Sequence, residues 1–337
     1  MVNKGVIEFI KNNLNHDFEH DFNYLMKELV HYQSLRGGDE IVKEIKNLIK
    51  TELGEEGEKR LVEISKKGFD SRINLYKQAL DLIKENKKQE ASNILVKLID
   101  TFPVKKKDED VVPIYNFQNM LESLLCYQEF GAIPSIRQVN EPITGYFFHL
   151  AVILFTDKDY EESNKMLDQA LAYNPVYVEG LLLRAECHLN LGNTHIFLHN
   201  VRLALKLSYR KIHFAKCYFL LSRYYLDLED KEIATALAIV SRHHEKTPFI
   251  DSLIAQINAL SKEQVRFTSP KDLTDVFQKA NIQFGPSKMV MQTLNGAFNE
   301  AKAKNNKALM KYYLTIIAEI TNDPKAKKDL EELKEIS

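Results

Sequence analysis

Small, large and helix-breaking residues recur in a fixed order along this chain, and that order leaves few folds open to it. In the segment 145–175, the small residues Ala151 and Ser163 are accompanied by Leu154 and Leu167, and a proline ends the pattern. Small residues let two helices approach closely, the leucines fill the space beside them, and proline cannot continue a helix. The segment therefore predicts a pair of antiparallel helices that must stack on other pairs to bury its apolar face.

The same order of residues can be aligned in four stretches of the chain. The stretch that starts at Val178 departs from this order most. Phe197 occupies a position that is small in the other stretches, and Arg184, His188 and Tyr209 also differ. We expect a shifted or wider helix pair there. The four stretches start at Arg72, Thr144, Val178 and Ala215.

These stretches resemble the 34-residue tetratricopeptide repeat. The stretch from Thr144 matches its signature positions 4, 7, 8, 11, 20, 24, 27 and 32 with Phe147, Leu150, Ala151, Leu154, Ser163, Leu167, Ala170 and Pro175. The resemblance implies an all-α fold, a right-handed α-α superhelix, and binding of a protein or peptide. From about Phe69 onward the chain is similar to a group of bacterial tetratricopeptide-repeat proteins, which implies fold and general binding only. The alternative is a helical bundle without repeats.

The composition agrees with an almost purely helical protein. The 337 residues include only 12 Gly and 9 Pro, and 45% of them are hydrophobic. Lys+Arg (46) balance Asp+Glu (47), so the excess of positive charge that a nucleic acid or an anionic membrane surface would attract is absent. We find neither a signal peptide nor a stretch approaching the ~20 apolar residues of a membrane span, and we expect a cytoplasmic protein. Cys126, Cys187 and Cys217 lie in apolar helical patterns and suit reduced core thiols.

The order of these features divides the chain into five segments. A helical module (1–68) has an apolar stripe through Phe18, Phe22, Leu25, Leu29 and Tyr32, with separators at Gly37–Gly38, Gly54 and Gly68. A first helix pair (69–103) precedes an irregular interruption (104–143), where we expect one helix near 115–130. Three consecutive repeats (144–248) and a C-terminal cap (249–337) follow.

The C-terminal segment predicts helices near 250–260, 271–280, 287–303 and 307–320. Ser269-Pro270 and Gly285-Pro286-Ser287 are signals for the start of a helix. The pair of helices around Asn305-Asn306 resembles another degenerate repeat, and a charged tail follows it.

Histidines supply the strongest match to a catalytic motif. His16-Asp17-Phe18-Glu19-His20 fits the H-x-x-E-H string of inverted zinc metallopeptidases. Placed on one helix, however, its histidines point away from the apolar stripe and toward solvent. His195 and His199 are expected on an outer helix face, and His243-His244 at a helix end suits cations near the helix dipole. Phosphate-binding and nucleophile-elbow motifs are absent, so we expect no catalytic residue, cofactor or metal.

The resemblance also implies where a partner binds. In the tetratricopeptide family the first helix of each repeat lines a concave groove. Chaperone-binding members use a pattern of Lys and Asn residues in this groove to bind a terminal carboxylate, and this chain lacks that pattern. Either the groove is open, or the segment 104–143 covers its aromatic end. The groove positions are Phe148, Val152 and Phe155; Glu179, Leu182, Glu186 and Asn190; and Lys216, Phe219 and Arg223.

Two functional classes fit this sequence. The first is a non-catalytic scaffold whose groove holds a peptide or helix of a partner protein. The second is a peptide-responsive regulator, motivated by the helical module in front of the repeats, in which ligand binding changes the curvature of the superhelix. We also expect the acidic row Glu179 and Glu186 to lie beside the basic row Lys216 and Arg223, either to hold a partner or to pair with each other.

Overall fold

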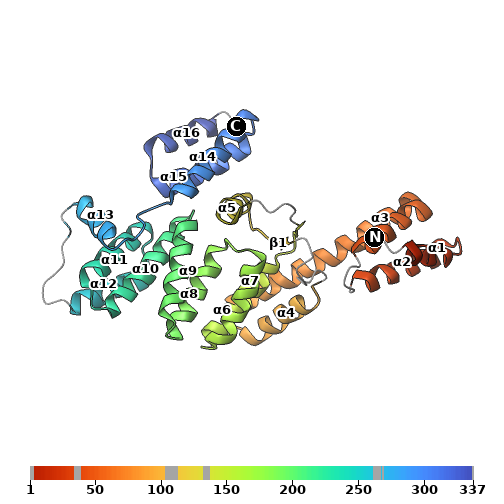
Figure 1. Ribbon diagram of the computed structural model, residues 1–337, viewed down its shortest axis with the longest axis horizontal. Coiled ribbons are helices and arrows are strands. Elements are labelled where there is room, and N and C mark those ends of the chain that lie inside the picture. The colour runs from red at the N-terminus through yellow and green to blue at the C-terminus, as the bar shows by residue number, and fades with distance from the viewer. Residues whose placement is uncertain are drawn as a thin grey trace. The chain divides into compact units, whose positions relative to one another are not determined.

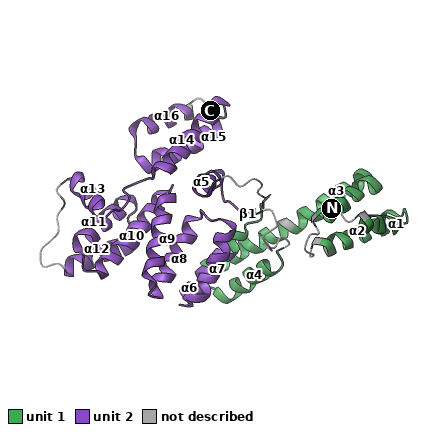
Figure 2. Ribbon diagram, in the orientation of Figure 1, with its two compact units in different colours: residues 1–114, 139–146 green, residues 115–138, 147–337 purple. Residues whose placement is uncertain are grey.

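The computed structural model describes residues 4–33, 39–102, 113–131, 137–260, 267 and 269–335, and it is built almost entirely from α-helices (Figure 1). The all-α prediction is therefore confirmed. The chain divides into two compact units, coloured separately in Figure 2. Unit 1 comprises residues 1–114 and 139–146, and unit 2 comprises residues 115–138 and 147–337.

Unit 1 begins with a small helical core. The apolar stripe of α2 (Phe18–Gln33) packs with α1 (Lys4–Asn12) and with the first part of α3 (Asp39–Lys84). The core residues are Ile10, Phe22, Leu25, Leu29, Val42, Ile45, Leu48 and Ile49.

Helix α3 breaks at Gly54 and continues to Lys84. Gly54 has φ 66° and ψ −160°, which only glycine adopts easily, so the separator expected there is confirmed. The separator expected at Gly68 is wrong, because the helix runs through it; its neighbours at 62–68 are all exposed, and a single glycine costs a helix only about 1 kcal/mol. The sequence Gly37–Gly38 lies outside the described residues.

The end of α3 forms a helix pair with α4 (Lys88–Asp100). Ala79, Ala91 and Leu95 are fully buried in this unit, as the repeat pattern requires. Arg72 donates hydrogen bonds to the Glu141 carboxylate, to the Thr101 hydroxyl and to the Leu98 carbonyl.

Unit 2 contains α5 in the interruption and a series of helices that follow the repeat pattern. Helix α6 is continuous, although its first turn belongs to unit 1. The bounds are α5 (Met120–Phe130), α6 (Ile143–Thr156), α7 (Tyr160–Tyr173), α8 (Val178–Asn190), α9 (Thr194–Leu207), α10 (Lys211–Asp227), α11 (Lys231–His244), α12 (Pro248–Leu260), α13 (Pro270–Lys279), α14 (Lys288–Ala303), α15 (Lys307–Thr321) and α16 (Pro324–Glu335).

One turn geometry closes five of the helix pairs. The residue two places after the first helix is left-handed, and the next residue donates its N–H to the carbonyl five places earlier, as Lys87 does to Leu82 and Asn193 to His188, both at 2.8 Å. This is the Schellman arrangement. The left-handed residues are Asn86, Lys158, Gly192, Glu229 and Asn305, with φ between 51° and 74°. The helix pair expected around Asn305-Asn306 is thus present.

In two of the helix pairs, a serine on one helix donates a hydrogen bond to the backbone beside an alanine on the other. Between α6 and α7, the hydroxyl of Ser163 donates to the carbonyl of Ala151 at 2.8 Å. Between α10 and α11 the roles of the two positions are exchanged, and Ser222 donates to the carbonyl of Ala234 at 2.7 Å. All four residues are fully buried, so a larger side chain at any of them would push the helices of these two pairs apart.

The interruption contains a shorter helix than expected. Residues Ile114–Tyr115 form strand β1, which pairs with β2 (Arg137–Gln138), and α5 starts only at Met120 because Asn119 caps it. Two prolines were expected to resist a second helix. Pro134 lies outside the described residues, and Pro142 directly precedes α6. Leu121 and Leu125 of α5 pack in the same core as Leu171 and Val176.

The C-terminal helices agree with the expected ranges, with one addition. Ser269 forms a capping box with Asp272, and Ser287 caps α14. The tail after Asp323 is the helix α16, where a charged tail was expected; Ala326 is buried, and Leu330 and Leu333 pack against the core of unit 2.

Candidate functional site

The aromatic end of the predicted groove lies on α6. Phe148 and Phe155 are partly buried, and they pack against the buried Ala151 and Leu167. The Phe148 ring lies 5.1 Å from the ring of Tyr177 in an edge-on arrangement, and the Phe155 ring lies 5.3 Å from that of Tyr160. Val152 is also partly exposed. Part of the surface of these side chains is thus accessible to solvent, and the rest stabilises the helix pair.

The predicted groove positions on α8 differ widely in exposure. Leu182 is 5% exposed and belongs to the core, whereas Asn190 is exposed. Glu179 accepts hydrogen bonds from Arg210 at 3.0 Å and from the buried His213 at 3.1 Å. Burial acts to raise the pKa of the Glu179 carboxyl, but the bond and charge of His213 and the charge of Arg210 outweigh it, so this pKa lies below its usual value.

The charged positions of α8 and α10 meet in one surface cluster. Lys216 Nζ lies 2.7 Å from Glu186 Oε1, which confirms that the acidic and basic rows lie side by side at this point. The ammonium of Lys216 and the guanidinium of Arg223 lie 5.9 Å and 6.0 Å from the centre of the Phe219 ring. We call Glu186, Lys216, Phe219 and Arg223 the α8–α10 cluster. The partly exposed Phe219 ring thus lies between two cations, one of which is paired with Glu186.

A second polar group, which sequence reasoning missed, is buried where α5 meets the ends of α7 and α9. Glu122 is 1% exposed, and it accepts hydrogen bonds from the backbone N–H of Gln118, from Asn174 Nδ2 and from the Tyr209 hydroxyl at 2.8, 2.7 and 3.0 Å. Asn119 Nδ2 in turn donates to the Tyr209 hydroxyl at 3.0 Å.

Two signals in the sequence point toward this group. Asn119 and Glu122 have the spacing of a capping box, and the side chain of Asn119 caps the N–H of Glu122. Tyr209 stands where the stretch from Thr144 carries Pro175, and its hydroxyl donates to Glu122.

The histidines of the H-x-x-E-H string are exposed, as expected, but the assumption that they share a helix is wrong. His16 has φ 67° and precedes α2, where its N–H donates to the buried Asp21 carboxylate. Glu19 pairs with Arg60 instead of approaching the histidines. Among the described residues, no three His, Cys, Asp or Glu side chains gather as a metal site would require.

The remaining histidines are surface or core residues. His195 and His199 are exposed on α9, as expected. His244 is not a cation at a helix end, because its ring stacks on Phe214 and Tyr218, and burial lowers its pKa to about 4.

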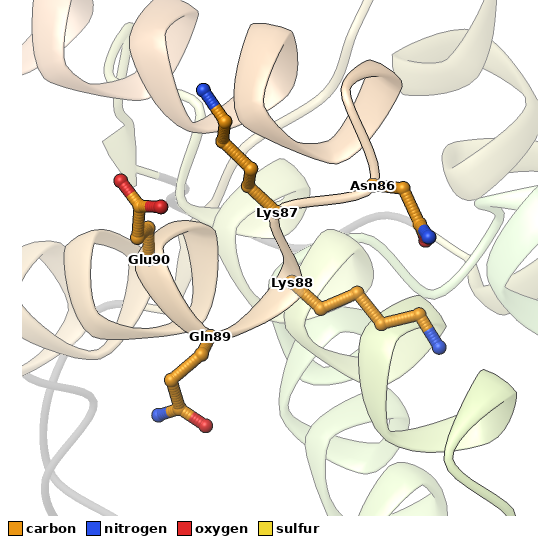
Figure 3. A pocket seen from close by; sticks show the side chains of 5 residues that line it. All are labelled: Asn86, Lys87, Lys88, Gln89 and Glu90. Carbon is orange, nitrogen blue, oxygen red and sulfur yellow. The ribbon is translucent and has the colours of Figure 1, made fainter.

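A surface depression lies at the turn between α3 and α4. Figure 3 shows that its lining comes from five consecutive residues, 86–90, with the side chains of Lys87 and Lys88 pointing apart. Lys87 is paired with Glu85 at 2.7 Å. Because no other element contributes to its lining, this depression does not bring converging groups to a ligand.

Neither the protein-family models nor the curated proteins give a match to this chain. Within the described residues, the helices are too short or too polar to cross a bilayer. Cys126, Cys187 and Cys217 are all buried and unpaired, as expected for core thiols.

Proposed function

We propose that this chain is a tetratricopeptide-repeat protein that binds a protein or peptide partner and has no catalytic activity of its own. The observation that supports this most is the α8–α10 cluster, which joins the first helices of two successive pairs into one partly exposed surface. In the proposed right-handed superhelix, the aromatic positions of α6 continue this surface. A cytoplasmic location is part of the proposal, since the three buried thiols suit a reducing compartment.

The cluster also favours a kind of partner. Phe219 offers an apolar face, and Arg223 is an exposed cation whose guanidinium lies 6.0 Å from the centre of the Phe219 ring. An aromatic or aliphatic side chain next to a carboxylate would satisfy both groups at once. We therefore propose a helix or extended peptide with such a pair as the ligand.

A photo-crosslinking experiment tests this proposal. Replacing Phe219 by a photoreactive phenylalanine should capture a discrete partner in cells of the source organism, whereas the same residue at the exposed His195 of α9 should not. With that partner, Arg223→Glu should reduce the affinity more than tenfold, about 1.4 kcal/mol, with strong salt dependence. An affinity that stays within twofold while the fold is intact would exclude the cluster and direct attention to Phe148 and Phe155.

A second candidate function is a peptide-responsive regulator. It is favoured by α3, which runs unbroken over residues 55–84 and so connects the N-terminal core to the first helix pair through one helix. A rearrangement of that pair would move the N-terminal core with it. Small-angle scattering with and without the captured partner distinguishes the two functions, because only the regulator changes shape beyond the added mass.

A further inference from the structure

Glu122 is a buried carboxylate whose neighbours come from distant parts of unit 2. Its partners are Gln118 beside α5, Asn174 at the end of α7 and Tyr209 after α9, and all three donate hydrogen bonds to it. Among the described residues, no lysine, arginine or histidine forms an ion pair with it. The charge of Glu122 is thus balanced by hydrogen bonds and by the N-terminal end of α5 alone.

The other ionisable groups around Glu122 do not supply the missing positive charge. From α8, the carboxylate of Glu179 acts on it as a like charge. His213 of α10 and Arg210 bond to Glu179 instead. Tyr209 donates to Glu122, and Tyr312 of α15 also lies within its electrostatic reach.

Two opposing effects therefore set the charge of Glu122. Burial, followed by the repulsion from Glu179, raises the pKa of this carboxyl, and the three donated hydrogen bonds lower it; the net pKa lies above the ordinary value. When α5 leaves its site, Glu122 regains water and an ordinary pKa. Since the docked state has the higher pKa, docking is strongest at low pH and weakens as the pH rises through that raised pKa.

The network can also accommodate the protonated form. Asn174 is fully buried, and its Oδ1 has no hydrogen-bond partner. If the amide of Asn174 turns over, this oxygen faces Glu122 and accepts the proton of its carboxylic acid. The turn exchanges the positions of Oδ1 and Nδ2, so Asn174 keeps one hydrogen bond to Glu122 in either protonation state, and only the direction of donation is reversed.

We propose that α5 is a proton-linked latch: protonation of Glu122 strengthens the docking of α5 on the ends of α7 and α9, and ionisation of Glu122 weakens it. This docking equilibrium lies within unit 2 and does not depend on the partner binding proposed above.

The buried thiol of Cys126 on α5 provides a direct measurement of the latch. A disulfide reagent that reacts at acidic pH, such as 4,4′-dithiodipyridine, labels Cys126 only when α5 opens. Peptide mapping separates this signal from Cys187 and Cys217, which are fully buried outside α5 and report wider unfolding. Each rate is divided by that of the same cysteine in the unfolded chain at the same pH, which gives an opening constant.

The native chain and two variants test the proposal. In the native chain, the opening constant of Cys126 should rise with pH above about 4.5, by up to tenfold per pH unit for one proton, and then level off. Glu122→Gln should give an opening constant that changes less than about twofold over the same range. Glu129→Gln, on the same helix but paired with Lys206, should keep the native slope.

The outcomes are decisive even if one variant misfolds. A flat native profile, or a native slope that persists in Glu122→Gln, overturns the latch. If Glu122→Gln does not fold, Tyr209→Phe replaces it. Loss of a donor to the ionised carboxylate raises only the docked pKa, so the opening constant should start to rise at the same pH but level off at a higher pH and a higher value; an unchanged plateau overturns the proposal.

Discussion

At the scale of single residues, the distance between paired helices depends on side chains no larger than serine. Ala151 is fully buried, and its carbonyl accepts the Ser163 hydroxyl, so neither the side chain nor the backbone has room to move. Ala151→Leu should lower the free energy of unfolding by about 1 to 3 kcal/mol through overpacking, as measured by denaturant titration. The exposed Ala255→Leu on α12 is the control. Equal stability of the two variants would contradict the packing assigned to this helix pair.

His244 gives a pH dependence of known sign. Burial, aided by the charges of His243 and Lys211, lowers its pKa from 6.5 to about 4. Because the folded pKa is the lower one, its stabilising effect is complete above pH 6.5 and is lost as the pH falls toward 4.

His244→Phe keeps a ring on Phe214 and Tyr218 but cannot be protonated. The variant should therefore lose about 1 to 2 kcal/mol less stability than the native chain between pH 7 and pH 4, allowing for the partial exposure of the ring. Chemical denaturation across that range measures it, and parallel profiles would show that His244 does not titrate on unfolding.

At the scale of helices, the two glycines of α3 have opposite roles. Gly54 has φ 66°, whereas Gly68 lies inside a regular, exposed stretch, and an added Cβ would meet nothing within 4 Å at either position. Gly54→Ala should destabilise the N-terminal core by about 1 to 3 kcal/mol, because its φ and ψ angles lie in a region that is almost exclusive to glycine. Gly68→Ala should stabilise α3 by about 0.5 to 1 kcal/mol. The two melting temperatures should move in opposite directions, and a shift of the same sign would contradict the assigned backbone.

The helices that could be predicted from sequence are those with strong local signals. The repeat pattern and the start signals at Ser269 and Ser287 gave the second half of the chain to within a few residues. Helix α16 was missed because only Ala326, Leu330 and Leu333 make its apolar contacts, among many charges. The start of α5 was missed because an asparagine cap, rather than apolar periodicity, determines it.

At the scale of the whole molecule, the surface positions were easier to predict than the buried polar group. The α8–α10 cluster follows from repeat spacing, because equivalent positions on successive first helices become neighbours. Glu122 meets Asn174 and Tyr209 across 52 and 87 residues, and no periodic rule connects them. A repeating pattern predicts contacts between equivalent positions, whereas the contacts of an inserted helix such as α5 depend on the particular fold.

The left-handed turn shared by five helix pairs is a place where the stability of the folded chain can be increased. Only one of those pairs has glycine at the left-handed position, while Lys158 and Glu229 adopt it as exposed side chains with a steric cost of about 1 kcal/mol each. A thermostable form of the chain is therefore accessible without touching the core: Lys158→Gly and Glu229→Gly should each raise the denaturation midpoint, and their effects should add because the turns belong to different pairs. A lower midpoint in either variant would show that the native side chain has a role beyond the turn.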